Sequence, residues 1–462
     1  KHSLESFNIE MNHFFRVSIL LASFSSPFLF AESIEDIREL LPEQVSSQRI
    51  EADIRQLVSF GTRHTLSETN SDKRGIGAAR RWIENEFNQI SSACGNCLDV
   101  IRISGVVSGK ERVPIATEIV NIIAIQRGNV DPNRMVMMSG DIDSRVSDPM
   151  DYTSDSPGAN DNASGMAGVI EAARVLSKSR FPGTIIYAGL SGEEQGLFGG
   201  EIVARHALEK GWQIKAVLNN DMIGNITGID GVIDNSSARV FSEGTRFLET
   251  KDEALKRRYR GGEVDSPSRN IARYIDKMAD QFITNLDVMM IYRLDRFGRG
   301  GHHRPFNELG IPGVRIMETH EHYHRQHQDI RLENGIEYGD VIEGVDFEYA
   351  KKLTALNVVS LAGMASAPPF PSNVKIKGAV SANTILEWTI PESNVAENLR
   401  GYKVYWRHTS SPEWTNSRYV GLVDNYTLEN IVIDNYFFGV ASVSNDGYES
   451  PVVFPGIMGS FD

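Results

Sequence analysis

The sequence predicts an α/β fold with a mostly parallel, mixed sheet flanked by helices, followed by a smaller all-β module. The first observation is that apolar strand-like runs alternate with amphipathic stretches between residues 100 and 320. Such alternation is typical of parallel strands connected by helices that cover both faces of a sheet. The second observation is a change after residue 366, where short alternating segments separated by turn residues replace helical periodicity.

The individual elements follow from the spacing of apolar residues along the chain. Helices are expected where these residues recur every three to four positions, at 51–60, 76–90, 164–179, 197–210, 269–282 and 347–365. Strands are expected at the short apolar runs 100–107, 118–126, 134–139, 184–190, 215–221, 287–292 and 313–318.

The N-terminal region resembles a secretory signal peptide. Arg16 precedes a short apolar run, and small residues lead to Ala31, after which cleavage is expected. The run is too short and too interrupted to span a membrane. We therefore expect a secreted or periplasmic protein with no membrane span after signal removal.

Length and composition bound the organisation and the partners. A chain of 462 residues suits a large domain and a small one. The proline-rich stretch 367–373 is the expected linker between them. The formal net charge of −14 argues against nucleic acid or anionic membranes as main partners. The predicted divisions are 1–31 for upstream residues and signal peptide, 32–49 for a connector, 50–366 for the large domain, 367–373 for the linker and 374–462 for a β-sandwich that resembles a fibronectin type III domain.

Only two cysteines occur, Cys94 and Cys97. In an exported protein, such a closely spaced pair indicates a small disulfide loop. Gly and Asn between them indicate a turn rather than the start of a redox-active helix. We expect this disulfide to be structural.

Acidic side chains and histidines follow several of the expected strands. Open α/β sheets place their ligands at such strand ends. Carboxylates gathered there would repel one another strongly without a cation between them. Mixed histidine and carboxylate ligands suit zinc, while an excess of carboxylates admits manganese or another hard divalent ion. The residues concerned are Asp141, Asp143, Asp161, Glu193, Glu194, Asp221, His320, His322, His324 and His327.

Residues from about 50 to 365 resemble the co-catalytic di-zinc aminopeptidases of the bacterial leucyl aminopeptidase type, in clan MH. The motifs that carry the resemblance are P-G-A-N-D-N-A-S-G, S-G-E-E-Q-G-L-F-G-G and L-N-N-D-M-I-G. The resemblance implies a phosphorylase/hydrolase-like zinc exopeptidase fold and two divalent metal ions, expected to be zinc. It also implies Asp161 as the bridging ligand, Glu193 as the general base, and Glu194 and Asp221 as further ligands. The last ligand is predicted to be His327, with His324 as the alternative.

Two positions depart from the family pattern. Asp141, in G-D-I-D-S, occupies the position of the family's first metal histidine, and a carboxylate there still belongs to the predicted ligand set. Asp143 would then lack the histidine ring that it orients in the family. His302 stands where related sequences usually have aspartate.

The function implied by the resemblance is that of an exported metal-dependent aminopeptidase. It would hydrolyse N-terminal residues from peptides, with Glu193 taking a proton from a water shared by the two metals. One alternative is a non-catalytic binding or scaffold protein, because Asp141 replaces the metal histidine. Another is a carboxypeptidase or a glutaminyl cyclase-like enzyme on the same fold. The C-terminal module is expected either to contact a surface, polymer or substrate, or to be a passive appendage.

Overall fold

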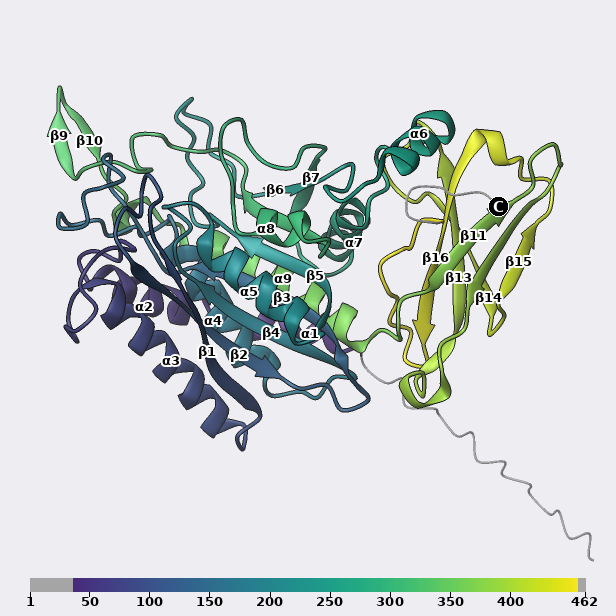
Figure 1. Ribbon diagram of the computed structural model, residues 1–462, viewed down its shortest axis with the longest axis horizontal. Coiled ribbons are helices and arrows are strands. Elements are labelled where there is room, and N and C mark those ends of the chain that lie inside the picture. The colour runs from purple at the N-terminus through teal and green to yellow at the C-terminus, as the bar shows by residue number, and fades with distance from the viewer. Residues whose placement is uncertain (1–35, 456–462) are drawn as a thin grey trace, which may run out of the picture. The chain divides into compact units, whose positions relative to one another are not determined.

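The computed structural model describes residues 36–455, so the predicted signal peptide at 11–31 lies outside the described residues. Figure 1 shows an α/β region with helices on both faces of one sheet, followed by two smaller antiparallel sheets. The predicted fold class is confirmed. Across residues 36–455, no helix is long and apolar enough to cross a membrane.

The large sheet is mixed and has the strand order β1-β2-β4-β3-β5-β8-β6-β7. Strand β3 pairs in parallel with β4 and β5, and β5 pairs in parallel with β8. The carboxyl ends of these four central strands therefore meet at one edge of the sheet. The strands are β1 (Leu98–Val107), β2 (Thr117–Gln126), β3 (Asp131–Asp141), β4 (Gly183–Leu190), β5 (Gln213–Asn220), β6 (Ser237–Ser242), β7 (Asp287–Ile291) and β8 (Gly313–Glu318).

Two apolar layers hold the helices against the sheet. Strand residues alternate between the layers, so that Ile122 and Ala124 face one of them while Ile123 and Ile125 face the other. The first layer is covered by α1 (Ile37–Gln44), α2 (Ser47–Val58), α3 (Gly75–Ala93), α4 (Ala163–Leu176), α7 (Pro267–Phe282) and α9 (Phe347–Ser366). The second is covered by α5 (Phe198–Glu209) and α8 (His303–Glu308).

Some elements were not expected from the sequence. Helix α6 (Lys251–Arg260) has no buried residue and therefore no apolar stripe to reveal it. A reciprocal capping box supports its start, in which Thr250 and Glu253 bond to each other's backbone N–H groups. Strands β6, β9 (Arg331–Glu333) and β10 (Ile336–Tyr338) are short, which removes most of their periodic signal. The predicted disulfide between Cys94 and Cys97 is confirmed.

The C-terminal region consists of two three-stranded antiparallel sheets around an apolar core that includes Trp388 and Tyr402. Its all-β character was predicted, whereas its assignment to the fibronectin type III class stays a prediction. One sheet contains β11 (Ser372–Lys377), β12 (Thr384–Thr389) and β15 (Asn425–Leu428). The other contains β13 (Leu399–His408), β14 (Asn416–Gly421) and β16 (Tyr436–Ser444).

A buried ion-pair network joins α7 to the C-terminal sheets. Asp265 accepts two hydrogen bonds from Arg407 Nη2, at 2.7 and 2.9 Å, and lies 3.1 Å from Arg273 Nη1. The side chains of Asp265 and Arg407 are fully buried. Because a buried carboxylate needs its partners, the start of α7 depends on a residue more than a hundred positions away.

Candidate active site

Three predicted ligands meet at the carboxyl edge of the sheet. Asp161 precedes α4, Glu194 follows β4, and His327 lies in the loop between β8 and β9. His327 Nε2 is 2.9 Å from Asp161 Oδ2 and 3.0 Å from Glu194 Oε1. One ligand atom from each residue lies within 4.8 Å of the other two. Two carboxylate oxygens and an imidazole nitrogen form a donor set that zinc commonly uses, so these residues fit one divalent cation.

The charges in this cluster are strongly coupled. Burial disfavours the charged form of His327, but Glu194 and Asp161 outweigh it and raise the pKa of His327 to about 9. Burial also acts against ionised Asp161, yet His327 holds the pKa of Asp161 well below its usual range. In the metal-free protein, an imidazolium therefore lies between the two carboxylates and offsets one of their two negative charges. A metal ligand must be a neutral imidazole, so metal binding displaces this proton.

Arg145 is the cation next to the cluster. Its Nε lies 2.8 Å from Glu194 Oε2, and its Nη2 lies 2.7 Å from His327 Nδ1. When Nε2 of a neutral histidine binds a metal, the ring proton is on Nδ1. Nδ1 therefore carries a hydrogen in the imidazolium as well as in the metal-bound ring, so it accepts no hydrogen bond from Arg145 in either form.

Glu193 lies beside the cluster and lines the same cleft, whose volume is about 1050 Å³. Burial raises the pKa of Glu193 well above its usual range, and Glu194 raises it further. The backbone N–H groups of Glu193 and Glu194 donate to the two oxygens of Asp143, at 3.2 and 3.1 Å. Asp143, whose Oδ2 also accepts from Thr65 at 2.8 Å, therefore fixes the position of both glutamates.

The cleft is negative at the cluster and positive along its walls. Its carboxylates include Asp161, Glu193 and Asp221. The positive charge of Arg299 helps to lower the pKa of the Asp161 carboxyl. Within residues 36–455, the Arg299 side chain makes no hydrogen bond or ion pair. The cations lining the cleft are Lys110, Arg112, Arg145, Arg205, Arg296, Arg299 and Arg304.

Comparison with known proteins identifies the family. Residues 121–341 match the model of peptidase family M28. A probable zinc metalloprotease of Leptosphaeria maculans is 43% identical, covering 91% of this chain and 97% of that protein. The chain belongs to peptidase family M28. A similar relative from Pyrenophora teres is 40% identical over 91% of this chain and 87% of its own length. The LapA aminopeptidase of Legionella pneumophila shares the fold, with a TM-score of 0.53, 20% identity and 77% of each chain covered.

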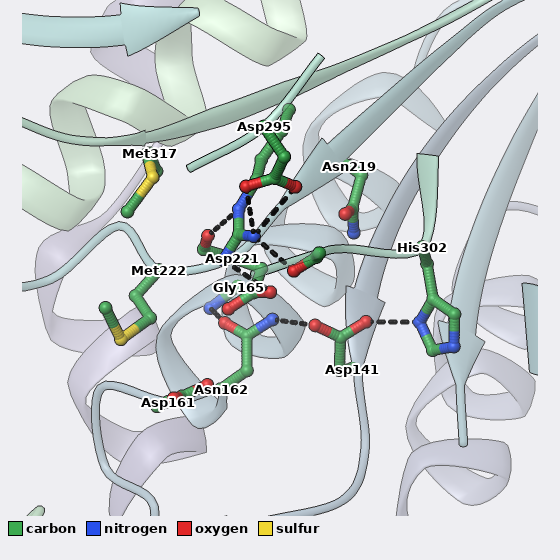
Figure 2. A network of polar contacts seen from close by, with 12 residues as sticks. Asp141, Asp161, Asn162, Gly165, Asn219, Asp221, Met222, Asp295, His302 and Met317 are labelled. Carbon is green, nitrogen blue, oxygen red and sulfur yellow. Dashed lines mark hydrogen bonds and ion pairs between the residues drawn. The ribbon is translucent and has the colours of Figure 1, made fainter. Parts of the chain in front are cut away.

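Asp141 and Asp221, the other two residues predicted to bind metal, have different partners in this M28 chain. Asp141 Oδ1 lies 2.6 Å from His302 Nδ1, and Asp141 Oδ2 accepts from Asn162 Nδ2 at 2.7 Å (Figure 2). Asp221 Oδ2 lies 2.8 Å from Nη2 of Arg315, a fully buried arginine on β8. Among the described side chains, two groups are close enough to share one ion, Asp161 with Glu194 and His327 and Asp276 with Asp280 and Asp287, and neither group contains Asp141 or Asp221.

The structure also separates the histidines of the predicted cluster. His327 joins Asp161 and Glu194, whereas the ring of His324 packs on Tyr338, with 4.8 Å between ring centroids. His320 Nδ1 lies 3.7 Å from Asp230 Oδ2, so its carboxylate neighbour is neither Asp161 nor Glu194. These histidines are close in sequence, but the turn between β8 and β9 directs them to different surroundings.

Asp340 is a supporting residue that the sequence did not indicate. Its carboxylate accepts the backbone N–H groups of Asn160 and Asp161, at 2.8 and 2.7 Å. Burial raises the pKa of Asp340 to about 7. Asp340 thereby holds the loop that carries Asp161, from a position that no local motif distinguishes. Arg315 was also missed, because it looks like an ordinary interruption of the apolar run Gly-Val-Arg-Ile-Met.

Proposed function

We propose that this chain is an exported, zinc-dependent aminopeptidase that removes N-terminal residues from peptides. The observation that carries the proposal is the grouping of Asp161, Glu194 and His327 beside Glu193 in a cleft of about 1050 Å³. Membership of family M28 supports hydrolysis of peptides, and the zinc metalloproteases among its relatives support zinc. Export rests on the signal-like segment at 11–31 alone.

In this proposal Asp161, Glu194 and His327 hold the metal, and Glu193 is the general base. Zinc at this position would supply a Lewis acid for the scissile carbonyl and would make water more acidic. The positive charge of the metal would favour the ionised form of Glu193, which would accept a proton from the attacking water and return it to the leaving amine. Asp143 keeps Glu193 in place by accepting a hydrogen bond from the backbone N–H group of Glu193.

The aminopeptidase assignment is supported by the charge distribution of the cleft. An N-terminal ammonium group requires nearby negative charge, and Glu193 lines the cleft beside the cluster. The arginines of the walls then meet the rest of the peptide, where backbone carbonyls, acidic side chains and the C-terminal carboxylate accept hydrogen bonds.

The test is activity and metal content measured on the same purified sample. Chelator-sensitive release of amino-acid nitroanilides is expected, and Glu193→Gln is expected to lower kcat by roughly 10²–10⁴-fold while zinc remains bound. Asp329→Asn provides a matched control, because Asp329 is an exposed carboxylate on the same loop as His327. Zinc binding with no turnover of any substrate, including internally cleaved and N-terminally blocked peptides, would instead favour a binding protein. Turnover of blocked peptides alone would contradict the aminopeptidase assignment.

A further inference from the structure

The two-metal prediction depends on Asp141 and Asp221, and the structure commits both of them to protein partners. We propose that this chain binds a single metal ion, at Asp161, Glu194 and His327, and that the guanidinium of Arg315 takes the place of the second. This inference rests on the proposed zinc-dependent function, and it changes how the site is assembled.

Arg315 connects Asp221 to a further buried carboxylate, Asp295. Arg315 Nη2 lies 2.8 Å from Asp221 Oδ2, and Nε donates to the Asp221 carbonyl at 2.5 Å. On its other side, Arg315 Nη1 lies 3.1 Å from both oxygens of Asp295 and also donates to the carbonyl of Gly300. The Arg315 side chain has no solvent exposure. Asp221 and Asp295 thus lie on either side of the same guanidinium.

A guanidinium in this position is a permanent cation. Arginine keeps its proton at any pH a protein tolerates, and its donors lie in a rigid plane. The position of Arg315 is fixed by the sheet, because Arg315 on β8 is in register with Asn219 on β5, two residues before Asp221. A metal ion approaching Asp221 would meet this positive charge and would have to displace the ion pair.

Asp141 is committed in a different way. Both of its oxygens have close partners: Oδ2 accepts from Asn162 Nδ2, and Oδ1 lies 2.6 Å from His302 Nδ1. Asn162 is itself fixed, since its Nδ2 also donates to the Asn220 carbonyl at 2.7 Å and its Oδ1 caps α4. The side chain of Asp141 is 2% exposed and does not line the cleft. Asp141 is therefore a structural acceptor facing the protein.

The two departures from the family pattern, Asp141 and His302, contact each other. Their aspartate–histidine contact of 2.6 Å is made by a histidine ring with no solvent exposure. The ring packs on α5 at Gly200, where an added Cβ would lie 2.8 Å from His302 Cδ2. Nδ1 of this enclosed ring faces Asp141, Nε2 is buried without a hydrogen-bond partner, and His302 is not among the residues that line the cleft. The second site therefore lacks both a free carboxylate and a histidine that could replace it.

The charges at this edge of the sheet support the proposal that Arg315 takes the place of a second metal ion. Asp141, Asp161, Asp221, Glu193 and Glu194 influence one another's ionisation, so the edge of the sheet needs more than one positive charge. One is supplied at His327, by a proton or a metal. The guanidinium of Arg315 supplies another, from within the sheet.

The decisive measurement is the number of zinc ions per chain. Purified protein is saturated with zinc, desalted and analysed by elemental mass spectrometry, and His327→Gln is treated identically. We expect one zinc per wild-type chain and none in His327→Gln, because the variant removes one of the three ligands that the proposal assigns to the metal. Two zinc ions in the wild type, or one retained by His327→Gln, would overturn the proposal. His324→Gln is the matched control and is expected to keep one zinc.

A crystal soaked in zinc gives an independent readout that does not require any variant to fold. Anomalous scattering at the zinc edge is expected to show one peak, between Asp161, Glu194 and His327. A second peak within bonding distance of Asp221 or Asp141 would overturn the inference. Peptidase activity in a protein with two zinc ions would leave the proposed function intact while removing this inference. A protein with one zinc and no peptidase activity would support the single-metal site and contradict the proposed function. A protein that binds no zinc would contradict both.

Discussion

The binding of zinc at His327 should release a proton, and the pH dependence of the affinity measures it. In the metal-free protein, Asp161 and Glu194 raise the pKa of His327 to about 9. Zinc binds the neutral ring, so the apparent affinity falls wherever the ring is protonated. With a pKa of about 9, affinity should rise about 90-fold from pH 6 to pH 8. A histidine with an ordinary pKa of about 6.5 would give only about a fourfold rise over the same range.

The assay is competition for zinc against a coloured chelator, with the chelator's own protonation taken into account. Calorimetry in two buffers of different ionisation enthalpy then counts the protons released. At pH 7 we expect about one proton per zinc, against about a quarter of a proton for an unperturbed histidine. The ligand carboxylates should add none, since the pKa values of Asp161 and Glu194 are lowered. A rise near fourfold, with a fractional proton, would refute this account of the cluster.

The raised pKa of His327 also predicts how the free energy of unfolding of the metal-free protein depends on pH. A pKa raised in the folded state means that the protonated ring stabilises the fold, fully below pH 6.5 and progressively less up to about pH 9. The raised pKa values of Glu193 and Asp221 act in the same direction. The His327 contribution is about 3 kcal/mol. Chemical denaturation of metal-free protein between pH 6 and 9 should show this loss, and saturating zinc should reduce it.

Three substitutions test other features. Arg299→Gln should lower kcat/KM roughly tenfold for peptides with acidic residues and leave neutral peptides unchanged, since a charged hydrogen bond contributes about 1.5–3 kcal/mol; equal losses on both classes would contradict a role in recognition. Asp340→Ala should destabilise the fold by about 2–4 kcal/mol in urea denaturation, because it leaves the N–H groups of Asn160 and Asp161 unpaired. Asp265→Ala should cost about 3–5 kcal/mol by stranding the buried Arg407, and a cost below 1 kcal/mol would show that water replaces the carboxylate.

The sequence was sufficient for the central sheet because its strands are buried on both faces. Strand β4, for example, is buried along its whole length, so its apolar run alone marks it as a strand. The grouping of Asp161 and Glu194 at this edge could be predicted for a related reason, whereas their roles as metal ligands stay a prediction drawn from the family resemblance. Each lies directly after a conspicuous local pattern, and the edge at which parallel strands end is fixed by their direction.

Residues that act through strand order could not be predicted in this way. The contact between Arg315 and Asp221 exists because β8 lies next to β5. That strand order cannot be inferred from the sequence of either strand alone. The same holds for Asp141 and His302, which are 161 positions apart. Helix α6 was missed because its stability comes from capping and charge rather than from an apolar face.

The attachment of Arg315 to the polypeptide has a consequence for the conditions under which the protein can work. A dissociable metal ion stabilises a protein according to its free concentration, and chelators or competing metal-binding molecules remove it. The Arg315 guanidinium is exempt from this mass action, because it is made with the chain and buried in the sheet. Of the positive charges that hold the carboxylate edge together, only the one at His327 therefore varies with the zinc supply around the protein.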